Sequence, residues 1–162
     1  MIDLLNKHLN VELFAAYQYL AISAYCHSIN MNGAAKWMQL QSQEELMHAM
    51  KFYNFINDRE GRIVLEPIKQ PKTEFSSLLE AFEAALGHER HVTSEIHNLV
   101  AEALERKDHA THTFLQWFVT EQLEEEATVV EIVQSLKLVG DNGHGLLMID
   151  RELGSRSAAT AG

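Results

Sequence analysis

The chain has 162 residues, a length that suits a single domain with a substantial hydrophobic core. Its net charge of −10 argues against nucleic acid or an anionic membrane as the main partner and fits cations, although a solvated acidic surface is the commoner reason for such a balance. The single cysteine, Cys26, cannot form an internal disulfide and fits a reducing compartment. No run approaches the roughly 18 apolar residues of a membrane span, and the first residues lack the features of a signal peptide, so we expect a cytoplasmic protein.

Apolar residues recur at spacings of three and four along most of the chain, which predicts long helices. Gly33 is predicted to separate the first two helices, Gly61 to end the second, and Asp108 to cap the start of the fourth. The predicted elements are helices over about 3–29, 34–60, 74–106 and 109–138, and a short helix near 144–153. We expect residues 1–153 to form a single domain and residues 154–162, which are small and polar, to form a disordered tail.

Residues 61–73 contain both prolines and show no helical period, so they predict a long connection. Thirteen extended residues reach at most about 43–47 Å, and a helix of 27 residues is about 40 Å long. The connection can therefore run back along the whole bundle and leave the second and third helices parallel, while the short turns make the other sequential pairs antiparallel. The predicted fold is all-α, a four-helix bundle with one long crossover and a short fifth helix near its C-terminus.

Each of the four long helices carries an acidic residue, or an acidic residue and a histidine, within its apolar stripe. These groups are Glu12, Glu44-Glu45-x-x-His48, Glu89 and Glu121-Gln122-x-Glu124-Glu125. A charge in a helical core is costly unless something compensates it, so four at similar depth indicate a shared metal. Carboxylates with one imidazole and no thiolate suit iron, manganese or similar ions better than a structural zinc site. Bridging Glu side chains with a terminal Glu and His form the di-iron arrangement of helical bundles.

The depth of these acids along the helices is consistent for one pair and inconsistent for the other. Glu89 precedes position 107, the predicted junction, by the same distance in sequence as Glu125 follows it, so the two are predicted to face each other. More residues separate Glu12 from Asn32 than separate Asn32 from Glu45. The difference corresponds to about 10 Å of helical rise. Tilted or staggered helices could absorb part of this difference. The alternative to a metal site is that tyrosine, glutamine and water satisfy the buried acids.

Four parts of the sequence carry a resemblance to a known family, and they are Glu12-Leu13 with Tyr19-Leu20, Gln43 to Ala49, Phe114 to Val119 with Glu121 to Glu126, and Asp150 to Leu153. Together they resemble the bacterial non-haem ferritins, and the match covers nearly the whole sequence. The resemblance implies a ferritin-like bundle that oxidises Fe(II) with O2 or H2O2. It also implies that ferric mineral is stored inside a hollow homo-oligomeric shell of 24 subunits.

The same resemblance implies a role for each matching residue. Glu12, Glu45 and His48 would hold a first iron, and Glu45 would bridge to a second iron held by Glu89 and Glu125, with Gln122 beside it. Glu44, Glu121 and Glu124 match a third, more weakly binding iron site. Tyr19 and Trp117 match aromatic electron donors near the centre, although packing alone is an equally open role for both.

Two related groups of proteins differ from this sequence. Bacterioferritins carry a second Glu-x-x-His on the fourth helix, where this chain has Gln122 and Glu125. Their haem-ligating Met follows the bridging Glu directly, and Leu46 stands at that position, so we expect no haem. The smaller DNA-protecting cages often have a basic N-terminal tail, whereas Lys7 is the one basic residue among the first ten.

Two other classes of function stay open from the residues. A non-catalytic helical scaffold or metal-buffering bundle would use the acids only to bind cations. A di-iron oxygenase would act on an organic substrate, and the third group of carboxylates argues weakly against it. The remaining histidines, including His88, are predicted to lie mostly on the surface.

Overall fold

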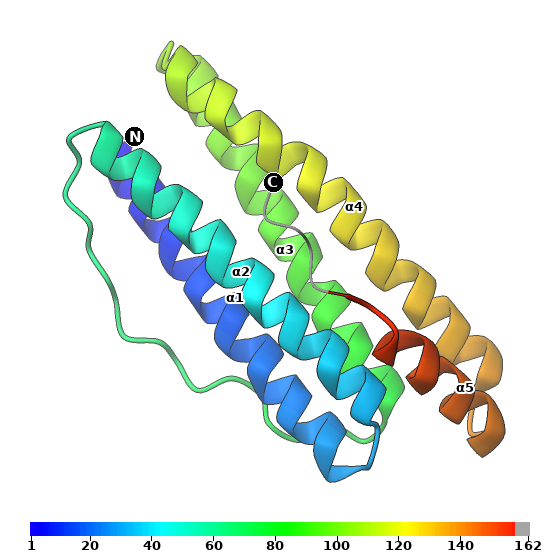
Figure 1. The fold of residues 1–162 in the computed structure, drawn as a ribbon. Coiled ribbons are helices and arrows are strands. Elements are labelled where there is room, and N and C mark those ends of the chain that lie inside the picture. Colours follow the sequence, from blue (N-terminus) through cyan, green and yellow to red (C-terminus); the bar gives the residue numbers. More distant parts are fainter. Residues whose placement is uncertain (158–162) are drawn as a thin grey trace.

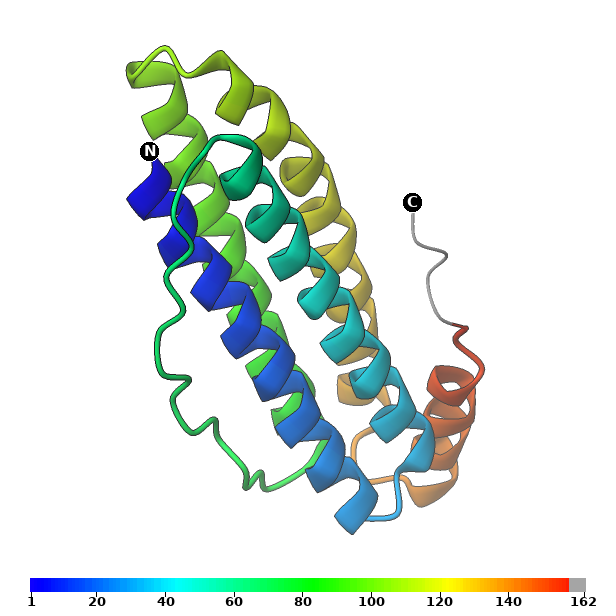
Figure 2. The ribbon, with the colours of Figure 1, turned by 60° about the vertical axis from the view of Figure 1, so that its left-hand side comes forward.

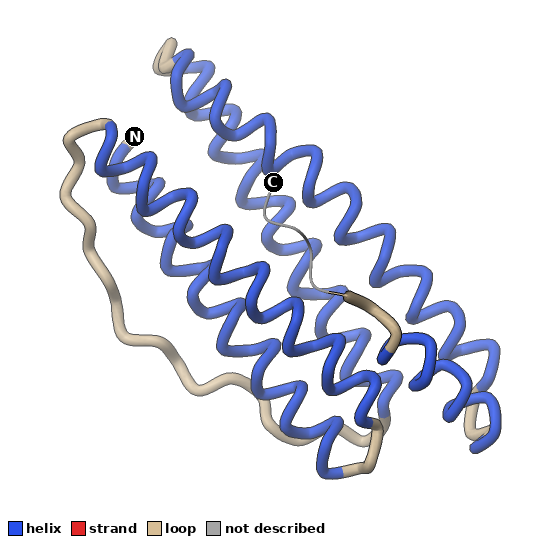
Figure 3. The backbone as a smooth tube through the Cα atoms, viewed as in Figure 1, coloured by secondary structure: helices blue, strands red, loops and turns tan. Residues whose placement is uncertain are grey.

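The computed structural model describes residues 1–157, which form a bundle of four long helices with a short helix at one end (Figure 1). The elements are α1 (Ile2–Ser28), α2 (Asn32–Asp58), α3 (Leu78–Glu105), α4 (His109–Val139) and α5 (Gly143–Gly154). The crossover leaves the end of α2 and runs the length of the bundle beside α1, so that α2 and α3 are parallel (Figure 2). It is drawn as the longest loop in Figure 3. The predicted all-α fold with one long crossover and a short fifth helix is confirmed.

Two asparagines on α1 hold the crossover in place. The Asn6 side chain donates to the carbonyl oxygen of Arg62 at 2.9 Å and accepts from the amide of Val64 at 2.8 Å. One turn later, Asn10 donates to the carbonyl oxygen of Val64 at 2.9 Å and accepts from the amide of Glu66 at 2.8 Å. Each amide side chain thus pairs with the extended backbone as a neighbouring strand would, and it satisfies polar groups that the loop cannot satisfy itself.

We expect Asn6→Ala to lower the free energy of unfolding by about 1–3 kcal/mol, because Asn6 is 7% exposed and its loss leaves two backbone groups of the crossover without partners. Urea denaturation of the purified protein measures this change. Asn98→Ala, at an exposed position on α3, is the matched control and should change stability by less than about 0.5 kcal/mol. Equal effects from the two substitutions would contradict the role of Asn6.

The turn between α1 and α2 differs from the prediction. Asn30, with φ of 60°, adopts the left-handed conformation, whereas Gly33 lies in the first turn of α2. A Cβ atom at Gly33 would lie 1.7 Å from the carbonyl oxygen of Asp150. Glycine is therefore required at position 33 because α5 packs directly against the backbone there, and not because a helix stops.

The other helix ends follow local capping. Glu60, with φ of 55°, is the left-handed residue after α2, and the amide of Gly61 donates to the Ile56 carbonyl oxygen at 2.9 Å. The third helix begins at Leu78 and not near residue 74, because the Ser77 hydroxyl accepts from the amide of Glu80 at 3.1 Å. Asp108 caps α4 as predicted, accepting from the amide of Thr111 at 3.2 Å.

The hydrophobic core has two parts, one toward each end of the bundle. The part near the α1–α2 turn and α5 includes Ile22, Trp37 and Phe82. The part near the other end includes Leu5 and Phe52. The predicted acidic residues lie between these two parts, so the bundle has a polar belt in its middle. Within the described residues, no helix combines the length and apolar character needed to cross a membrane.

Candidate metal centre

The polar belt consists of side chains that are almost completely buried. Their exposed fractions are 0% for Glu12, 1% for Glu45, 3% for His48, 1% for Glu89, 3% for Gln122 and 8% for Glu125. All four long helices contribute to it, because the acidic residues follow the same three- and four-residue spacing as the apolar stripe. Four carboxylates buried together need compensation from protons or cations.

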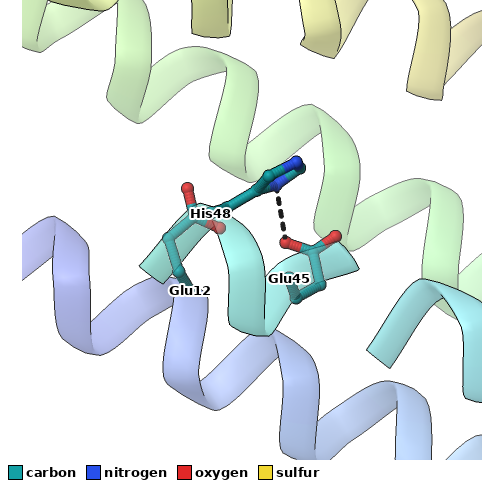
Figure 4. A group of neighbouring side chains, drawn as sticks. All are labelled: Glu12, Glu45 and His48. Carbon is teal, nitrogen blue, oxygen red and sulfur yellow. Dashed lines mark ion pairs between the residues drawn. The ribbon is translucent and has the colours of Figure 1, made fainter. Parts of the chain in front are cut away.

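One group of potential ligands comes from α1 and α2. Glu12, Glu45 and His48 each offer a ligand atom, and these atoms lie within 4.8 Å of one another. Figure 4 shows the three side chains converging, with the Glu45 Oε2 atom 3.4 Å from His48 Nδ1. Two carboxylates and an imidazole at this separation form a pocket of the size that one divalent cation requires.

A second group adds the other two helices. Ligand atoms of Glu45, Glu89 and Glu125 also lie within 4.8 Å of one another. Glu45 belongs to both groups, so its carboxylate stands between two potential cation positions. This is the geometry of a bridging carboxylate in a dinuclear site within a helical bundle.

The helix ends explain the depth mismatch between Glu12 and Glu45. Glu12 precedes Ser28, the last residue of α1, by the same distance in sequence as His48 follows Asn32, the first residue of α2. These two side chains are therefore level, and Glu45 lies one turn closer to the connection. The residues of the turn do not add helical rise, and the length of a glutamate side chain covers the remaining offset of about 4.5 Å.

Hydrogen bonds hold some carboxylate oxygens of the belt and leave others without a partner. His8 Nε2 lies 2.9 Å from Glu12 Oε1, and the Tyr19 hydroxyl donates to Glu89 Oε1. The Gln122 amide donates to Glu89 Oε2 at 3.2 Å. Within residues 1–157, buried oxygens of Glu12 (Oε2), Glu45 (Oε1) and Glu125 (Oε2) have no hydrogen-bond partner. Buried carboxylate oxygens without partners are costly, and a bound cation would satisfy them.

Electrostatic repulsion is strong within the belt. Burial, together with the charges of Glu125, Glu89 and Glu12, raises the pKa of Glu45 well above its ordinary value. Burial and the nearby Glu89 raise the pKa of Glu125 in the same way. Burial raises the pKa of Glu89 to about 7, although hydrogen bonds from Tyr19 and Gln122 oppose the change. The belt therefore takes up protons when cations are not present, and cations must displace them.

Glu12 and His48 behave differently. Burial alone would raise the pKa of Glu12, but the nearby His8 and its hydrogen bond outweigh that effect, so the pKa is lowered. Burial lowers the pKa of His48 despite the charge of Glu12. A neutral imidazole has a free lone pair, so both groups are in the protonation state that metal ligation requires.

The three outer acids lie next to the belt on the side of α2 and α4. Glu44, Glu121 and Glu124 line a cavity of about 200 Å³ together with Glu125. Among the described residues, a third group of ligand atoms on this side comes from His48, Glu121 and Glu125, and neither Glu44 nor Glu124 is part of it. The structure thus places the outer acids around one cavity without bringing all three to ligand distance.

The two aromatic residues differ in their relation to the belt. Tyr19 is buried at 1% exposure, and its hydroxyl touches Glu89 directly, so burial and the Glu89 charge raise its pKa well above the ordinary value. Trp117 is 39% exposed, and its ring centroid lies 5.4 Å from that of His48.

Two residues in or near the site differ from what the sequence suggested. His8 was not among the predicted site residues, although its position four residues before Glu12 places both on one face of α1. His88, predicted to lie on the surface, is only 9% exposed, and its ring centroid is 6.1 Å from that of Phe14. The crossover passes over this part of α3, with Pro67 and Ile68 lining the same cavity as His88. Periodicity within α3 carries no information about that cover.

We expect His8→Leu to weaken binding of a divalent cation at the Glu12 group by about 10–100-fold, the usual effect of removing a hydrogen bond that orients a ligand. His8 is 2% exposed, and leucine fills much of its volume beside Phe52. Calorimetric titration measures the affinity. His8→Gln, which can still donate to Glu12, is the matched control and should retain most of it. Equal losses in both variants would contradict an orienting role.

Comparisons with known proteins agree with the fold. A family model described as a ferritin-like domain matches residues 2–139. The chain is 43% identical to a bacterial non-heme ferritin of Staphylococcus epidermidis over 94% of this chain and 92% of the relative. It is 39% identical to one of Campylobacter jejuni over 93% and 90% of the two chains. An engineered closed form of the Archaeoglobus fulgidus ferritin superposes with a TM-score of 0.97 at 45% identity, covering 98% of this chain and 97% of the other. The open-pore ferritin of the same archaeon gives 0.96 at 46% identity, covering 97% and 96%.

Proposed function

Because this chain belongs to the ferritin family and is thus an iron-storage protein, we propose that its polar belt is a ferroxidase centre that oxidises Fe(II) to Fe(III) before storage. The observation that carries the proposal is the position of Glu45, whose carboxylate is shared by the Glu12–Glu45–His48 group and the Glu45–Glu89–Glu125 group. In this proposal Glu12, Glu45 and His48 hold the first iron, and Glu45, Glu89 and Glu125 hold the second. Two ions held on one bridging carboxylate can deliver two electrons to one oxidant molecule.

The protein contributes charge, orientation and proton movement. Anionic oxygens of the belt stabilise Fe(III) more than Fe(II), because the higher charge is attracted more strongly in a dry site. His8 and Tyr19 fix one oxygen of Glu12 and of Glu89, so that the ligands are oriented before iron arrives. Glu89, with a pKa of about 7, gives up its proton as iron binds. Gln122 orients Glu89 through its amide and lies beside the second iron.

We assign the outer cavity to a third, weaker iron site. Glu44, Glu121 and Glu124 line it next to Glu125, so ions can pass between the pair and the face formed by α2 and α4. We expect Glu124→Gln to change the number of Fe(II) oxidised per O2 and the later turnovers while leaving the first rapid phase within about twofold, because Glu124 belongs to none of the three ligand groups. Oxygen-electrode stoichiometry with stopped-flow absorbance separates these phases. A slowed first phase would contradict the assignment.

Tyr19 and Trp117 are proposed as electron donors to the centre. Tyr19 is one hydrogen bond from Glu89, and Trp117 packs against His48, so both lie within short electron-transfer distance of the ligands. These two contacts are the observations that support the proposal, and packing alone also produces contacts of this kind.

We propose a homo-oligomeric shell of 24 subunits, one domain over residues 1–153, a cytoplasmic location, and O2 or H2O2 as oxidant. We also propose that haem does not bind, because Leu46 follows Glu45 where haem-binding relatives have methionine. The net charge of −10 supports cations as partners over nucleic acid or membranes. Native mass measurement before and after iron loading tests the assembly: a monomer or dimer that never mineralises would overturn the shell.

Anaerobic Fe(II) titration followed by an oxygen pulse tests the ferroxidase function. A ferroxidase should bind about two Fe(II) per subunit tightly and then oxidise them within seconds, which gives a rapid rise in near-ultraviolet absorbance. A scaffold or metal buffer that binds cations without catalysis would show only slow autoxidation. Tight binding without rapid oxidation would therefore overturn the proposal.

A further inference from the structure

Arg156 lies just after α5, and its guanidinium is fixed by contacts with three side chains of α2. Its Nη2 atom lies 2.6 Å from Glu44 Oε2, and its Nη1 atom donates to Gln41 Oε1 at 2.5 Å. The guanidinium also lies 4.9 Å from the ring centroid of Trp37. Carboxylate, amide and aromatic ring together hold the planar cation in one position.

This position lies within the cavity that carries the outer acids. Arg156 lines it together with Glu44, Glu121 and Glu124. Of the described residues that line this cavity, Arg156 is the only cation, and it faces four acidic side chains. A guanidinium remains charged throughout the pH range of folded proteins, so it is a permanent counter-ion there.

The placement of Arg156 depends on tight docking of α5. The Asp150 carboxylate accepts from the amide of Ala34 at 2.8 Å, so α5 caps the first turn of α2. Lys36 donates to the carbonyl oxygen of Gly154 at 2.8 Å, and the absence of a side chain at Gly33 permits the close approach. The segment carrying Arg156 therefore leaves α5 from an anchored point on α2.

We propose that Arg156 is an internal competitor for cations at the outer site, because its guanidinium occupies Glu44 Oε2, an oxygen that a metal ion bound there would use. This inference rests on the proposed function, in which Glu44, Glu121 and Glu124 hold iron transiently. An ion can gain Glu44 Oε2 only when the ion pair with Arg156 breaks. The competition lowers the affinity of the outer site, and a site of low affinity passes ions onward instead of retaining them.

Terbium(III) titration of the full-length protein tests the competition. Tb3+ prefers carboxylate oxygens, and Trp37 lines the cavity, so tryptophan excitation should produce sensitised emission from an ion bound there. The part of this emission that is lost in the Glu44→Gln variant reports binding at the outer site, and we call it the Glu44-dependent component. We expect Arg156→Gln to strengthen binding of this component by about fivefold or more, the value of a well-formed ion pair. Binding of two Fe(II) at the paired site should stay unchanged.

Arg151→Gln is the matched control, since it removes one positive charge from an exposed position on α5. It should leave the Glu44-dependent component unchanged. The inference is overturned if Arg156→Gln leaves that component unchanged or weaker, if no such component exists in this variant, or if Arg151→Gln strengthens it equally. These outcomes are independent of oxidation, so a wild-type protein that fails the oxygen pulse would overturn the proposed function without deciding the competition.

Discussion

Glu45→Ala should lower the initial rate of Fe(II) oxidation by about 100-fold or more while the assembly state stays that of the unsubstituted protein. Glu45 is shared by the Glu12–Glu45–His48 and Glu45–Glu89–Glu125 groups, so its removal takes a ligand from each of the two proposed iron positions at once. Losing a residue that only orients a ligand already costs about 10–100-fold, and losing a shared ligand should cost more. Stopped-flow absorbance after mixing with oxygen gives the rate, and sedimentation velocity gives the assembly state.

His48→Ala and Glu131→Ala complete this experiment. His48 is the one imidazole of the predicted site, so its removal should reduce the rate similarly. Glu131 is an exposed acid on α4 outside both tight groups, so its removal should leave the rate within about twofold. Initial rates of Glu45→Ala that match the unsubstituted protein would refute the assignment of the bridging carboxylate.

Glu89→Gln should stabilise the iron-free protein at pH 8 by up to roughly 3 kcal/mol, although it weakens iron binding. Burial raises the pKa of Glu89 from 4.5 to about 7, and each pKa unit corresponds to about 1.4 kcal/mol between the protonation states. Glutamine mimics the neutral acid and can still accept from the Tyr19 hydroxyl. Urea denaturation of metal-free protein at several pH values measures the difference.

The pH dependence gives the sign of this effect. Below pH 4.5 the carboxyl is protonated in both the folded and unfolded states, so the substitution should have little influence there. Between about pH 4.5 and 7 the unfolded chain releases the proton first, so the unsubstituted protein loses stability as the pH rises. Above pH 7 the difference is constant. Glu131→Gln is the control, and a gain for Glu89→Gln that does not grow with pH would contradict the buried-charge argument.

The sequence predicted the helices well because the apolar period is long and uninterrupted, whereas several of their ends depend on single contacts. The third helix starts at Leu78 because Ser77 caps it, whereas we predicted a start near residue 74. Gly33 was predicted to be a helix stop because the residues around it give no sign of its packing against α5, whose residues lie more than a hundred positions away. Long-range packing of this kind leaves no trace in a local pattern.

The acids of the candidate site were predictable because they share the period of the apolar stripe, and the structure brings Glu12, Glu45, His48, Glu89 and Glu125 together as two overlapping groups. Their roles as iron ligands stay a prediction. His8 could have been found from its spacing to Glu12. Arg156 could not, because its contact with Glu44 depends on how α5 docks, and the sequence placed it in a disordered tail. Residues 158–162 of that predicted tail lie outside the described part of the chain.

The two ligand groups differ in which parts of the chain must meet to form them. Glu12, Glu45 and His48 all belong to the α1–α2 hairpin, so a single hairpin brings the complete first group together. The second group needs Glu45 from that hairpin and Glu89 and Glu125 from the α3–α4 hairpin. The second proposed iron position would therefore form only after the two hairpins have docked, and an ion held there would act as a cross-link between the two halves of the polypeptide.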